Sequence, residues 1–294
     1  MDNVFCFLNI YKPEGITSFD VIYKLRKILN IKKIGHSGTL DPMADGVLQI
    51  GINKASKLLD YLPSDKEYIA EIQFGYTSNT LDREGEITKC ETIPHFTKND
   101  LTSILKEFIG KIEQTPPKFS AIKVQGKKLC DVARKNPEKE IEIPKRTIEI
   151  FNIALQDFDC KNYTAKILVN CSKGTYIRTL AEDIAKKLNT KAYLTKLTRT
   201  KCGNFSIQNS IKIEDVTKDN IENISINPTD AIINNKITID IKNYNMVKNG
   251  IAINFPHNAK NIRKNEPVFL IFDNKLVSIG VLSDNKIKIK KFFG

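Results

Sequence analysis

The chain has 294 residues, of which 41% are hydrophobic and 27% are charged, a composition that excludes a wholly disordered protein and allows one large and one small domain. Forty-six Lys and Arg residues against thirty-four Asp and Glu residues give a formal net charge of +12. Such an excess favours a polyanionic partner, because each phosphate that a protein neutralises releases condensed counterions.

Metal ligands, disulfides and membrane segments are all poorly represented in the sequence. The six cysteines form no C-x-x-C pair, and the three histidines lie far apart. We therefore expect reduced thiols and no metal site. No apolar stretch reaches about 18 residues, and the N-terminal segment lacks the basic region of a signal peptide. These features predict a cytoplasmic protein that does not span a membrane.

The first third of the chain predicts strands and one helix. Apolar runs and period-two alternation predict strands at residues 4–10, 47–52 and 68–74. Apolar residues at helical spacing predict a helix over about 18–30. Thr17 and Asp20 form a capping-box pattern at its start, which supports that assignment.

The middle of the chain predicts two further helices and a pair of strands. Thr97 caps a helix that Gly110 ends, and a second amphipathic helix follows near 175–188. Alternating apolar residues predict strands at about 147–156 and 163–171. The first 230 residues are therefore predicted to form a mixed α/β body.

The sequence changes in character after about residue 228. The segments KITIDI, EPVFLIF, KLVSIGVL and KIKIKKF read as short strands separated by Asn, Asp and Gly, and helical periods are scarce. We predict a small β-rich domain over residues 231–294, attached to the body formed by residues 1–230.

A glycine-rich loop, GHSGTLDPMADG at residues 35–46, is the strongest candidate for function. Pro42 restricts Asp41 to an extended backbone and removes the next amide donor, so the loop presents a carboxylate from a stiff scaffold, as a nucleophile requires. The alternative is a turn aspartate that accepts only local hydrogen bonds, and the loop by itself favours that interpretation. It matches neither a P-loop nor a dinucleotide fingerprint. An aspartyl-phosphate enzyme remains open, with Asp45 as the only nearby carboxylate that could share a metal.

Several segments together resemble one enzyme family. The run GHSGTLDPMADGVLQIGINKASK resembles the signature of the tRNA pseudouridine-55 synthase family of pseudouridine synthases. Further segments resemble that family's motifs in the same order: YKPEGITS, KEYIAEIQFG, PPKFSAIKVQGKKLCDVAR, CSKGTYIRTLAEDI and AYLTKLTRTKCGNF. The similarity extends from residue 8 to about residue 205, and the C-terminal segment is similar to a small PUA-type RNA-binding domain.

The resemblance implies both a fold and a reaction. The fold is mixed α/β (α+β), a pseudouridine synthase fold with a largely antiparallel central sheet and a small β-rich PUA-like C-terminal domain. The implied enzyme breaks the N1–C1′ bond of the T-loop uridine at position 55 of tRNA, turns the uracil and rejoins it through C5. No cofactor or metal is implied, tRNA is the expected partner, and we expect a monomer. The base must first be extruded from the folded loop, which costs a few kcal/mol.

The positions that match the family's motifs imply site residues. Catalytic positions are implied at Asp41, Tyr68 and Arg178. Asp41 falls at the catalytic aspartate and Arg178 at the arginine that pairs with it. Tyr68 falls at the tyrosine that stacks on the extruded base, and its hydroxyl is expected to assist proton transfer from C5. Substrate-binding positions are implied at Lys12, His36, Asp82, Tyr176 and Leu197. The residue types also suit plainer roles, such as core packing for Tyr68 and Leu197 and a surface position on a helix for Arg178.

Two basic segments offer contacts to the RNA backbone. Residues 114–146 carry nine Lys or Arg against four acidic residues, and residues 184–203 carry six basic residues and no acidic one. We expect the first segment to be a mobile flap rather than a solvated linker. Its expected RNA contacts are Lys118, Lys123, Lys127 and Lys128.

The sequence also departs from the family pattern, and other functions remain open. Tyr11, Ser37, Ser78 and Asn79 stand where the family usually has Asp, Thr, Thr and Asp, which affects fine substrate contacts. One alternative is a guide-RNA-dependent pseudouridine synthase. The others are a non-catalytic RNA-binding or tRNA-folding protein and an aspartyl-phosphate phosphatase.

Overall fold

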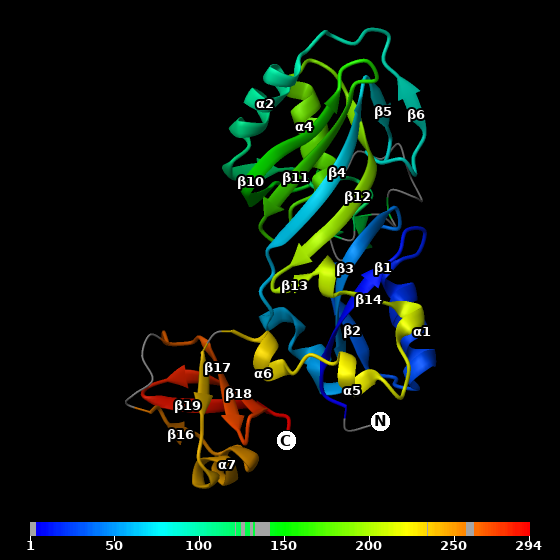
Figure 1. Ribbon diagram of the computed structural model, residues 1–294. Helices are drawn as coiled ribbons and strands as arrows, with labels where there is room; N and C mark the ends of the chain where they lie inside the picture. The colour runs from blue at the N-terminus through cyan, green and yellow to red at the C-terminus, as the bar shows by residue number, and fades with distance from the viewer. Residues whose placement is uncertain are drawn as a thin grey trace.

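The computed structural model describes residues 4–120, 122–124, 127–129, 132, 142–233, 235–256 and 262–294. A large sheet extends through the upper and middle parts of the elongated molecule, and a smaller sheet lies at its lower end (Figure 1). The predicted α+β class, with a largely antiparallel central sheet and a β-rich C-terminal part, is confirmed.

The central sheet contains ten strands among the described residues. They are β1 (Phe7–Lys12), β2 (Ile34–Ser37), β3 (Ala44–Ile52), β4 (Lys66–Phe74), β7 (Gly110–Gln114), β10 (Arg146–Asp159), β11 (Thr164–Cys171), β12 (Ala192–Cys202), β13 (Phe205–Ser206) and β14 (Ile211–Lys212). Their order is β14-β1-β3-β12-β4-β11-β10-β7, with β2 paired to β3 and β13 to β12. Only the β1–β14 and β3–β12 pairs are parallel.

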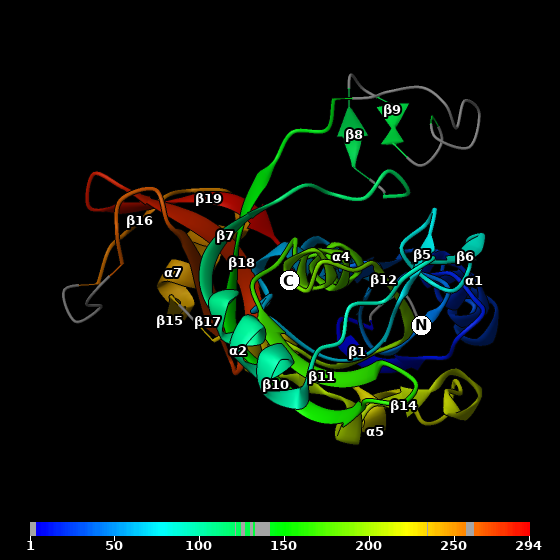
Figure 2. The same cartoon turned by 90° about the horizontal axis from the view of Figure 1, so that it is seen from above.

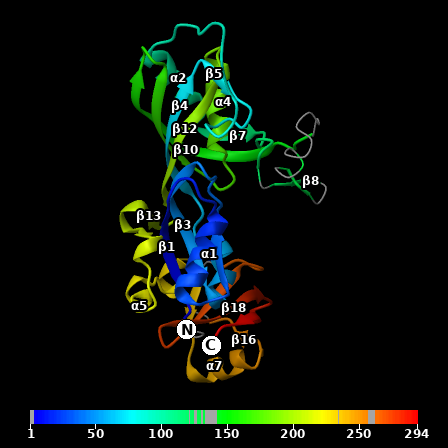
Figure 3. The same ribbon diagram turned by 90° about the vertical axis from the view of Figure 1, so that its right-hand side faces the viewer.

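Helix α1 (Ser18–Leu29) covers the part of the sheet that contains β1 to β3 (Figure 3). The predicted capping box is present, since the Asp20 amide donates to Thr17 Oγ1 and the Thr17 amide donates to Asp20 Oδ2. The helix ends at Asn30, whose left-handed backbone has a φ of 54°. Its buried face packs against the apolar side chains of β1 and β3, so the helix fixes the N-terminal half of the sheet.

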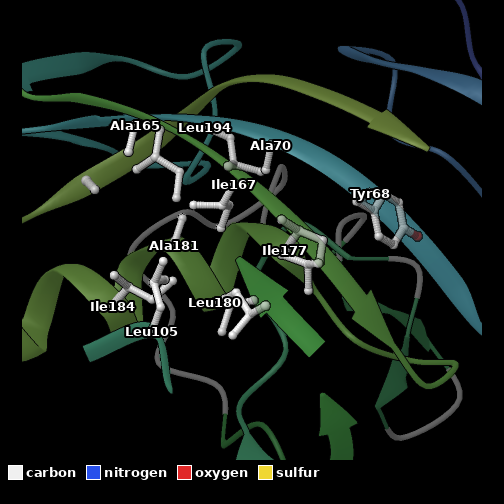
Figure 4. Packing of buried hydrophobic residues seen from close by; sticks show 14 of the residues in the cluster. Tyr68, Ala70, Leu105, Ala165, Ile167, Ile177, Leu180, Ala181, Ile184 and Leu194 are labelled. Carbon is white, nitrogen blue, oxygen red and sulfur yellow. The ribbon is translucent and has the colours of Figure 1, made fainter. Parts of the chain in front are cut away.

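A second core lies under α4 (Ile177–Lys187) and α2 (Lys98–Glu107). Ile177 and Leu180 of α4 face Ala70 and Ile167 of the sheet, and Tyr68 lies at one end of this cluster (Figure 4). The two halves of the sheet thus have separate cores, and they meet where β3 pairs with β12.

Shorter elements connect and extend the sheet. Strands β5 (Tyr76–Ser78) and β6 (Ile87–Lys89) form one hairpin, and β8 (Lys123–Val124) and β9 (Lys127–Lys128) form another that projects from the body (Figure 2). The side chains of Lys123, Lys127 and Lys128 lie outside the described part of the structure, so their predicted RNA contacts stay predictions. The short helices are η1 (Asn53–Lys57), η2 (Leu59–Tyr61), η3 (Ile207–Asn209), η4 (Ile213–Asp215), α5 (Ile221–Ile224) and α6 (Pro228–Ala231).

The C-terminal sheet contains five strands in the order β15-β17-β18-β19-β16. They are β15 (Lys236–Thr238), β16 (Ile253–Asn254), β17 (Pro267–Phe272), β18 (Lys275–Ser283) and β19 (Lys286–Phe292), accompanied by α7 (Ile241–Lys248). The sheet joins the body through apolar contacts: Phe293 stacks on Phe5 at 5.5 Å, and Phe269 meets Tyr61 edge-to-face at 5.3 Å between ring centroids. No helix in the described ranges is long and apolar enough to cross a membrane.

Several elements differ from the sequence-based expectation. Strand β12 was not predicted, because register shifts near residues 194–196 and 199–201 interrupt the two-residue alternation. Strand β2 lies inside the predicted loop. Helix α7 begins where a strand was expected to continue, because the Asp240 side chain accepts the Asn243 amide at 2.7 Å and caps it.

Candidate active site

A pocket of about 400 Å³ opens where the two halves of the central sheet meet. It has the size of a small-molecule binding site. Asp41 enters it from the loop between β2 and β3, Tyr68 from β4 and Leu197 from β12, while Tyr176 and Arg178 come from the start of α4. The structure therefore brings five of the predicted site residues to one cavity.

Arg178 lies between two carboxylates. Its Nη2 atom is 2.9 Å from Asp41 Oδ2, and its Nη1 atom is 3.3 Å from Asp82 Oδ2. The same two nitrogen atoms donate to the carbonyl oxygens of Thr80 and Phe119, each at 3.1 Å. With its side chain 4% exposed, the guanidinium is held in one orientation and aims one edge at Asp41.

Asp82 does not line the pocket but supports Arg178 from behind. Its side chain is 3% exposed, and its Oδ1 atom accepts the Thr80 hydroxyl at 2.6 Å and the Glu84 amide at 3.0 Å. Both oxygen atoms of the Asp82 carboxylate are thus bound by groups of the protein. The other carboxylate, Asp41, has a side chain that is 35% exposed and is open to a ligand.

The protonation of Asp41 depends on opposing influences. Burial raises the pKa of the Asp41 carboxyl group above its ordinary value, and the adjacent Arg178 guanidinium opposes that shift. Asp82 raises the pKa further, while Lys12 lowers it. Arg178 is therefore the main group that favours the ionised form of Asp41.

The loop that carries Asp41 is tied down along its length. Ser18 Oγ accepts the Leu40 amide at 2.9 Å, and the Gly15 amide donates to the Pro42 carbonyl at 2.9 Å. Lys12 is fully buried beneath the loop, and its ammonium donates to the carbonyls of Pro13, Pro42 and Ala44 at 2.6–3.3 Å. Lys12, predicted as a substrate contact, thus lies under the loop and not in the pocket lining.

Arg199 holds the loop from the opposite side. This arginine of β12 is fully buried; its Nη2 atom donates to the Gly38 carbonyl at 2.8 Å and its Nε atom to the Val47 carbonyl at 2.7 Å. Gly46 passes so close to the Arg199 backbone that a Cβ atom there would collide with it. Its φ of +107° also favours glycine, so the close approach of the loop to β12 depends on glycine at position 46.

The two tyrosines form walls of the pocket. Tyr68 is 5% exposed, and burial raises the pKa of its hydroxyl to about 12, although Arg199 opposes the shift. The hydroxyl is therefore protonated at neutral pH. Tyr176 is fixed through its backbone, because the buried Gln114 amide group donates to the Tyr176 carbonyl at 3.0 Å and accepts its amide at 2.8 Å.

His36 lies on β2 and does not line the pocket. Its Nδ1 atom is buried and has no hydrogen-bond partner among the described residues. Burial, helped by the charge of Arg199, lowers the pKa of His36, which favours the neutral imidazole. Its predicted contact with extruded nucleotides stays a prediction.

Sequence reasoning missed several residues of this site. Lys66, Ser120, Ile122 and Arg146 line the pocket, and Arg199 supports it. Lys66 and Arg199 belong to quoted motif segments, so those motifs offered a signal. No group of metal ligands was found within the described ranges.

Two family models match this chain over residues 26–232. The family model for the N-terminal domain of TruB family pseudouridylate synthase matches residues 26–177, and the model for the tRNA pseudouridylate synthase B C-terminal domain matches residues 178–232. The chain is 39% identical over 287 residues to "tRNA pseudouridine synthase B" of Clostridium tetani, covering 97% of this chain and 98% of that protein. The chain is also 44% identical over 209 residues to "tRNA pseudouridine synthase B" of Oceanobacillus iheyensis, covering 70% of this chain and 68% of that protein.

A similar fold occurs among solved structures. The structure of H/ACA RNP bound to a substrate RNA containing 2′-deoxyuridine aligns with a TM-score of 0.74 and 23% identity, over 99% of this chain and 85% of that one. At this identity the likeness concerns the fold. The match of the family model and the 39% identity to a relative over nearly the full length together show that the chain belongs to the TruB family of pseudouridylate synthases.

Proposed function

We propose that the protein isomerises the T-loop uridine at position 55 of tRNA to pseudouridine. The observation that carries the proposal is the 2.9 Å ion pair between Arg178 and Asp41 at a pocket that Tyr68 lines. Relatives of nearly the same length, described as tRNA pseudouridine synthase B, support tRNA as the substrate.

In this proposal Asp41 acts on the ribose or base of the extruded nucleotide. An ionised carboxylate stabilises or attacks an oxocarbenium-like sugar, as in glycoside chemistry. Arg178 keeps Asp41 charged and aimed into the pocket, and Asp82 positions Arg178. Asp41 is the reacting carboxylate, while Arg178 and Asp82 position it.

Tyr68 and Leu197 would enclose the uracil. A tyrosine face stacks on any pyrimidine, which suits a base that must turn while it remains bound. Because its pKa is raised to about 12, the Tyr68 hydroxyl is more suited to donate a hydrogen bond than to act as a phenolate base. Tyr176 would contact the sugar or base from the α4 side of the pocket.

The remaining assignments also stay proposals. Residues 231–294 would form a separate RNA-binding domain, and residues 1–230 the catalytic domain. The protein would act as a cytoplasmic monomer. The basic segments 114–146 and 184–203 would contact the tRNA backbone, and His36 would help to hold the extruded nucleotides.

The test uses an unmodified T-stem-loop transcript and no guide RNA. Pseudouridine is mapped after incubation with the wild type, with Asp41→Ala and with Asp60→Ala, which changes an aspartate of η2 outside the pocket. We expect pseudouridine at the T-loop uridine with the wild type and Asp60→Ala, and none with Asp41→Ala. Modification by Asp41→Ala would overturn the proposal, and activity only with added guide RNA would favour the guide-dependent alternative.

A further inference from the structure

Lys66 is a pocket residue whose charge is not neutralised by the protein. It is the first residue of β4, and its side chain lines the pocket. Within the described ranges its ammonium group forms no ion pair with a carboxylate, and the cations Arg199 and Lys173 both act to lower its pKa. Burial, together with Arg199, lowers the pKa of Lys66.

Arg199 supplies a second unsatisfied donor beside Lys66. Its Nη1 atom is buried and has no hydrogen-bond partner in the described part of the chain, although Nε and Nη2 are both used. A methyl group added to Gly38 would lie 3.5 Å from Arg199 Nη1 and 3.5 Å from Lys66 Nζ. The two nitrogen atoms therefore lie close to the same point beside Gly38, where Lys66 lines the pocket and Arg199 Nη1 is sealed from solvent next to it.

Two neighbouring cations without a carboxylate partner favour an anion beside them. A buried charge is stable when it is paired. Among the described residues that line the pocket, Asp41 is the only carboxylate, and Arg178 already holds it. An RNA substrate in the pocket would supply the negative charge, since its backbone phosphates are anionic.

We infer that Lys66, with the buried charge of Arg199 beside it, forms a subsite next to Gly38 that binds a backbone phosphate beside the reacting nucleotide. This inference rests on the proposed function and adds a specific anchor for its substrate. Gly38 lies in the loop that carries Asp41, and Lys66 lies on the same face of β4 as Tyr68. A phosphate held there would position the attached ribose near Asp41 and its base near Tyr68.

The experiment removes the charge on each side of the contact in turn. T-stem-loop RNAs carry one neutral methylphosphonate at successive positions around the target uridine, with each diastereomer tested separately. Their dissociation constants are measured with Asp41→Asn protein that has either Lys66 or Lys66→Gln. Lys66→Met serves as a second neutral variant, Lys66→Arg tests rescue, and Lys98→Gln removes an exposed lysine of α2, outside the pocket and outside both basic segments, as a matched control.

We expect Lys66→Gln to weaken binding of unmodified RNA about tenfold, as for loss of a charge-assisted hydrogen bond. One methylphosphonate position should weaken binding to the Lys66 protein by a similar factor and abolish the difference between Lys66 and Lys66→Gln. Lys66→Arg should restore most of the affinity. The subsite is overturned if Lys66→Gln and Lys66→Met bind unmodified RNA normally, or if their defects persist at every modified position.

The readout separates this inference from the proposed function. Binding is measured with a protein that lacks the Asp41 carboxylate, so it does not depend on turnover. Pseudouridine formation without any coupling between Lys66 and a phosphate would overturn the subsite alone. Coupling without pseudouridine formation by the wild type would overturn the proposed function and leave the phosphate contact in place.

Discussion

The Asp41 loop and the C-terminal sheet are held in place by different forces. The loop depends on a few buried cations, since Lys12 and Arg199 bind its carbonyl groups and Arg178 binds its carboxylate. The C-terminal sheet depends on apolar packing spread over many side chains, among them Phe269 and Phe293. A single substitution should therefore affect catalysis at the loop and only stability at the sheet.

The largest effect is expected for Arg178→Met. It would leave Asp41 and Asp82 without their shared cation, which costs about 3–5 kcal/mol of folding stability. It should also lower kcat on the order of 10³-fold, as for loss of an oriented charge. The kcat and the folding stability of Arg178→Lys should lie between those of the wild type and of Arg178→Met. Thermal unfolding and single-turnover rates check this, and Arg83→Met, an exposed arginine paired with Glu14, should behave like the wild type.

Arg199→Met should have the next largest effect. The carbonyl groups of Gly38 and Val47 would lose their donor, at about 1–3 kcal/mol for each group left unsatisfied. A displacement of the Asp41 loop by about 1 Å is expected to lower kcat roughly 10²-fold. Full activity with a lowered melting temperature would show that Arg199 supports the fold but does not position Asp41.

The lowered pKa of Lys12 predicts a loss of activity at alkaline pH. Burial lowers the pKa of Lys12 to about 8, so the ammonium that holds the loop is present below this pH and lost as the pH rises through it. The unfolded chain keeps its lysine protonated to about 10.4. Between these two pH values the unfolded state binds one proton more than the folded state. The titration of Lys12 therefore raises the free energy of unfolding as the pH increases.

The corresponding measurement compares activity with stability. Activity of the wild type should fall several-fold between pH 7 and 9. Over the same range, the melting temperature of the wild type should not fall more than that of Lys12→Met. In Lys12→Met, activity should be lower at pH 7 and should lack this decline. An unchanged alkaline decline in Lys12→Met would assign it to another group.

The smallest effect on activity is expected at the C-terminal sheet. Phe293→Ala removes a side chain that is 4% exposed and stacks on Phe5, and should cost about 3 kcal/mol of stability. Its activity on a short T-stem-loop should stay within about twofold of the wild type, since Phe293 does not line the pocket. A much larger loss of activity would mean that the apolar contacts also position the site.

Much of the fold could be predicted because its signals are local. The capping boxes at Thr17 and Thr97 and the alternation in β4 and β11 are each contained within one element. Strand β12 lacked such a signal because its register shifts break the alternation and its basic residues suggest a surface. Arg199 is nevertheless fully buried, since its partners come from residues more than a hundred positions away.

The site shows the same limit. Motif resemblance indicated Asp41, Tyr68 and Arg178, and the structure places them around one pocket. It did not indicate that Lys12 supports the loop from below, or that Lys66 faces Arg199 across Gly38. Such relations depend on which strands pair, and a single sequence carries little information about that.

The central claim is that Arg178 keeps Asp41 ionised in a pocket whose burial favours the protonated carboxyl group. It can be tested by following the Asp41 carboxyl carbon by NMR through a pH titration of the wild type and Arg178→Gln. The account predicts an ionised Asp41 at neutral pH in the wild type, and a higher Asp41 pKa in Arg178→Gln. In both proteins, activity should fall as the pH drops through that pKa. An Asp41 pKa that does not respond to the loss of Arg178, or an acidic loss of activity that does not follow it, would contradict the account.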